Sequence, residues 1–144
     1  MKRWLALDLG KVRIGAALSD SLGITAQPLL VLKSAGTQQD IIAIGKLINE
    51  HKVTQVIVGL PLNMDGTESS TTQKVRDFTG KLLQKLSVPV YFVDERLTSK
   101  QAERLMIEGN VRREERRQKI DKVAAALILQ SALEGAALIP VEKS

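Results

Sequence analysis

The chain has 144 residues, a length that fits one domain with a hydrophobic core of its own. The absence of cysteine excludes disulfides and thiolate metal sites, and no apolar run approaches the roughly 20 residues that cross a bilayer. A net charge of +5 favours a polyanionic partner, whereas 3% aromatic residues argue against binding single strands by base stacking on an aromatic platform. We therefore expect a soluble cytoplasmic protein with one domain over residues 1–138 and a frayed C-terminal tail over residues 139–144.

The first predicted elements form an antiparallel meander. Residues 4–9 favour a buried strand, because five of the six are apolar. Gly10 opens a turn, and residues 13–19 return as a second strand beside the first. A third strand is expected over residues 24–32, where Pro28 lacks an amide hydrogen and therefore favours the edge of a sheet. Short connections between the three strands make the meander antiparallel.

Helices and strands then alternate, which is typical of a crossover unit with parallel strands. A helix is predicted from Thr37, with Asp40 in its first turn, to about His51, and it is followed by a strand over 53–59 and a polar loop over 60–72. The next elements are a helix and a strand over 88–93, and the inner face of that helix carries Val75, Phe78, Leu82, Leu83 and Leu86. A capping-box pattern at 98–101 begins a helix that ends at about 109–110, a basic segment covers 112–119, and the last helix extends from Ile120 to about Glu134. The predicted class is α/β, with a mixed sheet of five strands and helices packed on it.

Three acidic residues fall where this topology would gather them at one edge of the sheet. Asp8 interrupts the first strand, and burying an unpaired carboxylate costs several kcal/mol, so a cationic group should meet it. Glu95 follows the fifth strand, and the carboxyl ends of parallel strands form a common ligand-binding edge. Asp121 begins the last helix, and Ala124 and Ala125 on the same face would let that helix approach the sheet closely.

Carboxylates gathered in this way favour a divalent metal site. The acids would repel one another, and Mg²⁺ or Mn²⁺ suits ligands that are all oxygen. Two such ions about 4 Å apart can activate water and stabilise the leaving oxygen in phosphodiester cleavage. We expect Asp8 to bridge the two ions and Glu95 and Asp121 to complete their coordination. The only histidine, His51, lies at a predicted helix end and offers no rival nucleophile.

Each acid also has a purely structural interpretation. Asp8 could cap the glycine turn that follows it, and Asp121 could complement the dipole of its helix. Asp94 and Glu95 are adjacent and point to opposite faces of an extended chain, so only one should face the metals. If Asp94 is that one, Glu95 would pair with Arg96.

Basic residues near these acids are candidates for binding the phosphate backbone. The segment 112–119 carries five basic residues beside Glu114 and Glu115, and it could be a solvated face or a substrate contact. We favour substrate contact, because the segment immediately precedes the helix of Asp121. Asn63, with Asp65 and Gly66, could equally form a plain turn. The predicted substrate-binding residues are Lys11, Arg13, Asn63, Arg96, Arg112, Arg113, Arg116 and Arg117.

Four motifs give the chain a specific resemblance. They are Asp8-x-Gly10-x-x-Arg13-Ile-Gly15, the Gly59-Leu-Pro61 loop ending in Asp65-Gly66, Asp94-Glu95-Arg96-Leu-Thr98, and Asp121-x-x-Ala-Ala125. Through them the chain resembles the YqgF family over about residues 3–133, a family of Holliday-junction-resolvase-like proteins linked to pre-16S rRNA maturation. The resemblance implies a ribonuclease H-like fold, a metal-dependent nuclease, and the 5′ end of precursor 16S rRNA as substrate.

The same resemblance carries Asp8, Glu95 and Asp121 over as the acidic site, and it favours Glu95 over Asp94. One departure concerns junction cleavage. The RuvC-type junction resolvases resemble this site but place two acids one turn apart on the closing helix, whereas position 124 here is alanine. A four-carboxylate site is therefore not expected, which argues against a Holliday junction resolvase acting on branched DNA.

Two other functional classes compete with the nuclease. An Asp-x-Gly followed by a glycine hairpin also opens the phosphate site of actin, Hsp70 and sugar kinases, but those proteins repeat the unit in two lobes and this chain fits only one. A non-catalytic RNA-binding, ribosome-associated factor would be indicated by the loss of an acid, and all three acids are present. We expect a nucleic-acid partner and no membrane, with ribosome association and the choice between monomer and homodimer left open.

Overall fold

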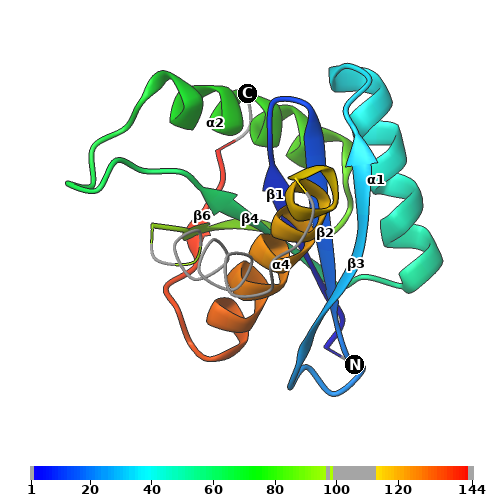
Figure 1. Ribbon diagram of the computed structural model, residues 1–144. Coiled ribbons are helices and arrows are strands. Elements are labelled where there is room, and N and C mark those ends of the chain that lie inside the picture. Colours follow the sequence, from blue (N-terminus) through cyan, green and yellow to red (C-terminus); the bar gives the residue numbers. More distant parts are fainter. Residues whose placement is uncertain (1, 97, 99–112, 143–144) are drawn as a thin grey trace.

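Figure 1 shows the computed structural model, which describes residues 2–96, 98 and 113–142, with only the backbone described for 113–121. The described chain forms a six-stranded sheet in the order β3-β2-β1-β4-β5-β6. Its strands are β1 Trp4–Leu9, β2 Arg13–Ser19, β3 Ala26–Lys33, β4 Gln55–Leu60, β5 Val90–Asp94 and β6 Ile139–Pro140. The predicted α/β class is confirmed, with one strand more than expected.

The predicted pairings are also confirmed. β2 runs antiparallel to both β1 and β3, and β3, which contains Pro28, lies at the edge of the sheet. β1 is parallel to β4, and β4 is parallel to β5. The carboxyl ends of these three central strands therefore meet at one edge, as the alternation of helices and strands predicts.

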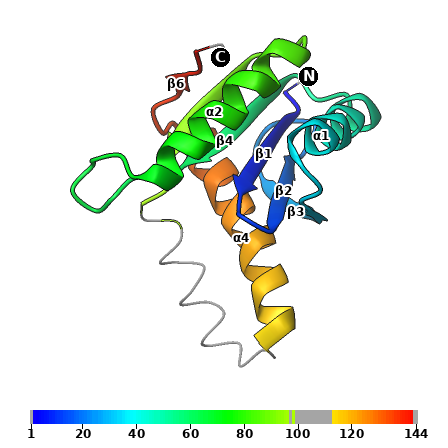
Figure 2. The same cartoon turned by 90° about the horizontal axis from the view of Figure 1, so that it is seen from above.

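Helices cover both faces of the sheet. In Figure 2, α1 (Thr37–His51) and α2 (Ser70–Lys85) lie on one face, and α4 (Arg113–Leu133) crosses the other. Because side chains alternate along a strand, each face has its own core. Leu5, Leu7 and Phe92 pack toward α1 and α2, whereas the small residues Ala6 and Ala17 lie beneath α4. Among the described residues, none of the helices is long and apolar enough to span a membrane.

Two predictions about the C-terminal part are wrong. The last helix begins at Arg113 rather than at Ile120, since the basic segment consists of Arg, Glu, Gln and Lys, which are good helix formers despite their lack of an apolar stripe. Residues 139–140 are not frayed but pair with β5, and Ile139 and Val141 pack against the core. The helix predicted over 98–110 lies, apart from Thr98, outside the described residues.

The N-termini of α1 and α2 are capped in different ways. Ser69 caps α2 in a reciprocal box, in which its hydroxyl accepts from the Thr72 amide and the Thr72 hydroxyl accepts from the Ser69 amide. α1 begins at Thr37 as expected, but its N-cap is Gly36 and makes no side-chain cap. Asp40 instead accepts hydrogen bonds from the Ser34 hydroxyl (2.6 Å) and the Ala35 amide (2.9 Å), which fixes the connection from β3 to α1.

Candidate active site

Asp8 lies near the carboxyl end of β1 on the face that α4 covers. It follows Ala6, a residue of the core beneath α4, by two positions, and it pairs across the ladder with Gly15 of β2. Its side chain is half-buried. Since Gly15 has no side chain, the neighbouring strand adds no bulk directly beside Asp8. The carboxylate thus stands at the sheet edge where the three parallel strands end.

Glu95 reaches toward Asp8 across β4. It is the first residue after β5, and its amide donates to the carbonyl of Leu60. Its carboxylate lies over Gly59, where a Cβ would collide with Glu95 Oε2 and would come within 2.5 Å of Ile128 Cδ1 of α4. β4 lies between β1 and β5 in the sheet. A glycine at position 59 therefore provides the space in which the Glu95 side chain lies, and no other residue would leave it open.

The electrostatics of Glu95 reflect this position. Burial, which is the largest cause, and the negative charges of Asp8 and Asp94 together raise the pKa of the Glu95 carboxyl to about 7. Two carboxylates that share a site cannot both ionise at the usual cost. The charge of Asp8 therefore disfavours ionisation of Glu95, and a divalent cation bound by both carboxylates would offset that cost.

Asp94 has a different partner. Its carboxylate accepts from Arg96 Nε at 2.8 Å and from the Arg96 amide at 3.0 Å, and the salt bridge to Arg96 Nη2 measures 2.6 Å. Burial alone would raise the pKa of Asp94, but these hydrogen bonds hold it below its usual value. Arg96 also donates to the carbonyl of Met64 at 3.3 Å. The pairing of Arg96 with Asp94 leaves Glu95, not Asp94, beside Asp8.

The third acid, Asp121, belongs to α4. Four residues later Ala125 is fully buried against the sheet, and Ile128 contacts the space above Gly59. Helical spacing places position 121 on the face of α4 that carries these two residues. The side chain of Asp121 lies outside the described part. Among the described residues, no three acidic or histidine side chains form a metal-binding group.

The predicted substrate-binding residues are dispersed. Lys11 is exposed in the turn between β1 and β2, and Arg13 is half-buried at the start of β2. Asn63 donates to the hydroxyl of Thr67 at 2.9 Å, and Asp65 accepts from the Thr67 amide, so this part of the loop has the contacts of a plain turn. Arg113, Arg116 and Arg117 lie in the first turns of α4 with their side chains outside the described part, and Arg112 lies outside it altogether.

No role is predicted from the sequence for two residues that the structure places near candidate site residues, namely Gly59 beside Glu95 and Lys74 in the same pocket as Lys11. Gly59 belongs to one of the four motifs, and a glycine inside an apolar strand is also a signal of close approach by another group. Lys74 of α2 lines a pocket together with Lys11. A charge on an exposed helix face carries no such signal in the sequence.

The raised pKa of Glu95 predicts a pH-dependent stability for the metal-free protein. Below about pH 4.5 the carboxyl is protonated in both the folded and the unfolded chain, so the full stability is present. As the pH rises toward 7 the unfolded chain releases this proton first, and the fold loses up to about 3 kcal/mol. We expect the free energy of unfolding of Glu95→Gln to exceed that of the wild type by less than about 1 kcal/mol at pH 5 and by up to about 3 kcal/mol at pH 8.

Urea unfolding in EDTA at both pH values measures this difference. Mg²⁺ should stabilise the wild type more at pH 8 than at pH 5, because the ionised carboxylates would then have a cationic partner. An equal difference between wild type and Glu95→Gln at pH 5 and pH 8 would contradict the raised pKa of Glu95.

Comparison with known proteins assigns the architecture to the fold of the RuvC-like resolvases, the ribonuclease H-like class. Thermus thermophilus RuvC, solved with a Holliday junction substrate, superposes with a TM-score of 0.61 at 16% identity and covers 96% of this chain and 100% of its own. The fowlpox virus resolvase superposes with a TM-score of 0.54 at 15% identity, covering 92% and 97%. At these identities the likeness establishes the fold.

The sequence comparisons establish the family. The profile of the RuvX family, described as Holliday junction resolvase, matches residues 2–135. Proteins named "Putative pre-16S rRNA nuclease" from Syntrophomonas wolfei and Lactococcus lactis strain IL1403 are 43% and 44% identical, each over 94% of this chain and 96% of the relative. The chain belongs to the RuvX family, also called YqgF, which confirms the predicted membership. It is a nuclease, a hydrolase that acts on nucleic acid.

Proposed function

We propose that this protein is a Mg²⁺- or Mn²⁺-dependent nuclease that hydrolyses phosphodiester bonds in the 5′-end maturation of pre-16S rRNA. The observation that carries the catalytic part is the buried Glu95 carboxylate over Gly59, which lies close enough to Asp8 for the charge of Asp8 to raise its pKa. The names of relatives at 43–44% identity support the substrate. The cytoplasm, where rRNA precursors are processed, is the proposed location, and the pre-ribosome is a proposed partner.

The donor set fits divalent metal. The described acids offer only oxygen ligands, and a bound cation would offset both the burial and the neighbouring negative charges that raise the pKa of Glu95. Asp8 and Glu95, with Asp121 as the third ligand, would hold the ions, and we propose two of them. When bound, such ions lower the pKa of water and stabilise the charge of the leaving oxygen.

The protein's own residues orient the acids and the substrate. Gly59 and Ile128 confine the Glu95 side chain, and the Arg96–Asp94 salt bridge fixes the chain immediately after β5. Arg96 binds Asp94 and the Met64 carbonyl, so we propose that it holds the loop over residues 61–69 in place. Direct substrate binding, which the sequence predicts for Arg96, is not part of this proposal. We propose that Lys11, Arg13 and the basic start of α4 neutralise the phosphate backbone.

Cleavage of branched DNA is the second candidate, because the matching family is described as Holliday junction resolvase. Against it stands Ala124, which is buried in α4 one turn after Asp121. The carboxylate that the RuvC-type enzymes carry at this place is therefore missing, and RNA is the favoured substrate.

A direct comparison of the two substrates tests this proposal. The purified protein is incubated with a 5′-extended 16S rRNA precursor or a four-way DNA junction, in Mg²⁺, Mn²⁺ or EDTA. We expect metal-dependent cutting of the RNA. Cutting of the junction alone would replace the maturation nuclease with a resolvase, and binding without cutting of either would indicate a non-catalytic factor.

A further inference from the structure

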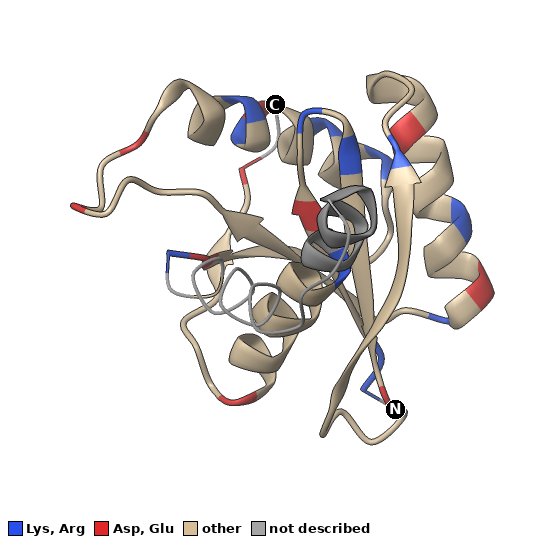
Figure 3. Cartoon of the chain, in the orientation of Figure 1, with Lys and Arg blue, Asp and Glu red and all other residues tan. Residues whose placement is uncertain are grey.

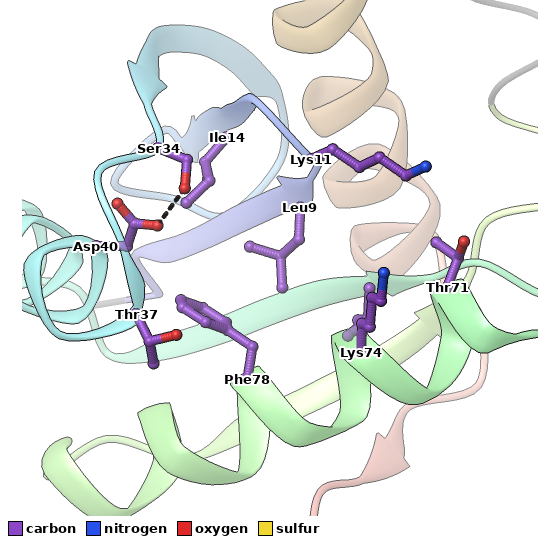
Figure 4. A pocket seen from close by; sticks show the side chains of 11 residues that line it. Leu9, Lys11, Ile14, Ser34, Thr37, Asp40, Thr71, Lys74 and Phe78 are labelled. Atoms are coloured by element: carbon purple, nitrogen blue, oxygen red, sulfur yellow. Dashed lines mark hydrogen bonds between the residues drawn. The ribbon is translucent and has the colours of Figure 1, made fainter.

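A pocket of about 190 Å³ lies on the face of the sheet opposite Asp8. It is enclosed by the turn between β1 and β2, the start of α1, and α2 (Figure 4). Leu9 lines it, and because successive side chains of a strand point to opposite faces, Leu9 and Asp8 project from the end of β1 in opposite directions. The pocket and the acidic site therefore share the same edge of the sheet.

The floor of this pocket is apolar. Leu9 and Ile14 come from the first hairpin, and Val75 and Phe78 come from the inner face of α2. Ile14 and Val75 are buried, whereas Leu9 and Phe78 are only partly covered, so apolar surface is open to a ligand. Figure 4 shows the Phe78 ring facing the cavity together with Leu9. Such a floor suits a flat, weakly polar ring.

One end of the pocket is cationic. Lys11 of the hairpin turn and Lys74 of α2 extend toward the same end, beside Thr71 in the first turn of α2 (Figure 4). Figure 3 shows basic residues on both elements at this end of the molecule. Among the described residues, neither lysine has a carboxylate in a salt bridge. The first turn of α2 adds the partial positive charge of a helix N-terminus.

The acid in the lining does not neutralise these lysines. Asp40 is buried, and its two oxygens accept hydrogen bonds from the Ser34 hydroxyl and the Ala35 amide. Figure 4 places this hydrogen bond at the opposite end of the pocket from Lys11 and Lys74. The hydroxyls of Ser34, Thr37 and Thr71 add groups that can donate to or accept from the edge of a base.

An apolar floor with a cationic rim points to a ligand that combines a flat ring with a negative group. The volume lies below the roughly 300–1,000 Å³ of sites for larger ligands, so it admits one base rather than two. We propose that this pocket binds one nucleotide of the substrate strand, with its base on Leu9 and Phe78 and its phosphate at Lys11 and Lys74. The inference rests on the proposed nuclease function and adds a second contact with the same strand.

This contact would select unpaired substrate. A base can enter the pocket only when it is free of its partner and its stack, which is the usual mode of sequence- or structure-specific RNA recognition. Lys11 follows Asp8 by three residues, so the strand would pass around the glycine turn from the acidic site to the pocket. The nuclease should therefore prefer a single-stranded segment next to the bond that it cleaves.

Charge reversal at the rim tests the proposal. In an Asp8→Asn background, which prevents cleavage, Lys74→Glu should weaken binding of a 12-nucleotide single-stranded RNA at least fivefold and reduce the salt dependence by about one phosphate contact. Lys81→Glu is the matched control, since Lys81 is exposed on α2 two turns further along and does not line the pocket. It should change the dissociation constant less than twofold. Equal effects of the two variants would overturn the proposal.

A mononucleotide probe tests whether the pocket binds a nucleotide and whether the substrate strand occupies the same place. Adenosine monophosphate should shift the backbone amide resonances of Thr37, Thr71 and Lys74, and the 12-nucleotide RNA should displace it. Absence of shifts at these positions, or binding that the RNA does not displace, would overturn the assignment to the substrate strand. Cleavage by the wild type is assayed separately. If the wild type cuts RNA in a metal-dependent manner but the pocket binds no nucleotide, only the pocket proposal is rejected. If the pocket binds the mononucleotide and the RNA but the wild type cuts no substrate, only the proposed nuclease function is rejected.

Discussion

Replacing Asp8 by asparagine should abolish metal-dependent cleavage while leaving the fold and the affinity for RNA largely intact. Asparagine matches the shape of aspartate but is neutral, so the bridging carboxylate would be lost. The loss of several kcal/mol of metal-assisted stabilisation corresponds to at least about a 10³-fold fall in rate. Cleavage rates, thermal unfolding and RNA binding of the variant are the measurements. Retained cleavage would contradict the two-metal site.

A matched control separates loss of this carboxylate from loss of charge in general. Glu50 is exposed near the end of α1, on the part of the fold that the acidic site does not use. Glu50→Gln should cleave at the wild-type rate. The Asp8→Asn variant should also lower the pKa of Glu95, because one of the two charges that raise it has been removed.

Replacing Gly59 by alanine should damage both activity and stability. The new methyl group would collide with Glu95 Oε2 and with Ile128 Cδ1 of α4, so either the acid or the helix must move. Overpacking of this kind costs about 1–3 kcal/mol, and displacement of a catalytic group by about 1 Å costs about 10²-fold in rate. Urea unfolding and cleavage of the precursor RNA measure the two effects.

Gly45 provides the control for this substitution. It lies inside α1, and a Cβ there would meet no atom within 4 Å. Gly45→Ala should raise the free energy of unfolding by about 0.5–1 kcal/mol, because alanine is the better helix former, and should leave cleavage unchanged. Wild-type cleavage by Gly59→Ala would show that Glu95 does not need the space above β4.

Local patterns in the sequence were enough to predict most of the fold. The bounds of β1 and β2 follow from apolar runs around Gly10, and the edge position of β3 follows from Pro28. The start of α4 could not be predicted in this way, because helix propensity without an apolar stripe also fits a solvated loop. β6 was missed because two residues give no strand period, and its pairing depends on packing against the core.

The candidate site is harder to predict from the sequence than the fold. The sequence indicates which acids lie at the end of each strand, but it leaves open which of two neighbouring acids faces Asp8. In the structure Asp94 forms a salt bridge with Arg96, so Glu95 is the acid beside Asp8. The position of the Arg96 guanidinium depends on the path of the chain after β5, which the sequence does not reveal. The pocket between Lys11 and Lys74 joins two elements more than sixty residues apart, and only the tertiary arrangement brings them together.

The most direct test of the central claim is anomalous diffraction from crystals of the protein soaked in Mn²⁺. We expect manganese bound by the carboxylates of Asp8 and Glu95, on the face of the sheet that α4 covers, and we expect it to be absent from crystals of Asp8→Asn. Manganese that binds elsewhere while these carboxylates stay free of metal at saturating concentration would contradict the assignment of this acidic pair as the catalytic centre.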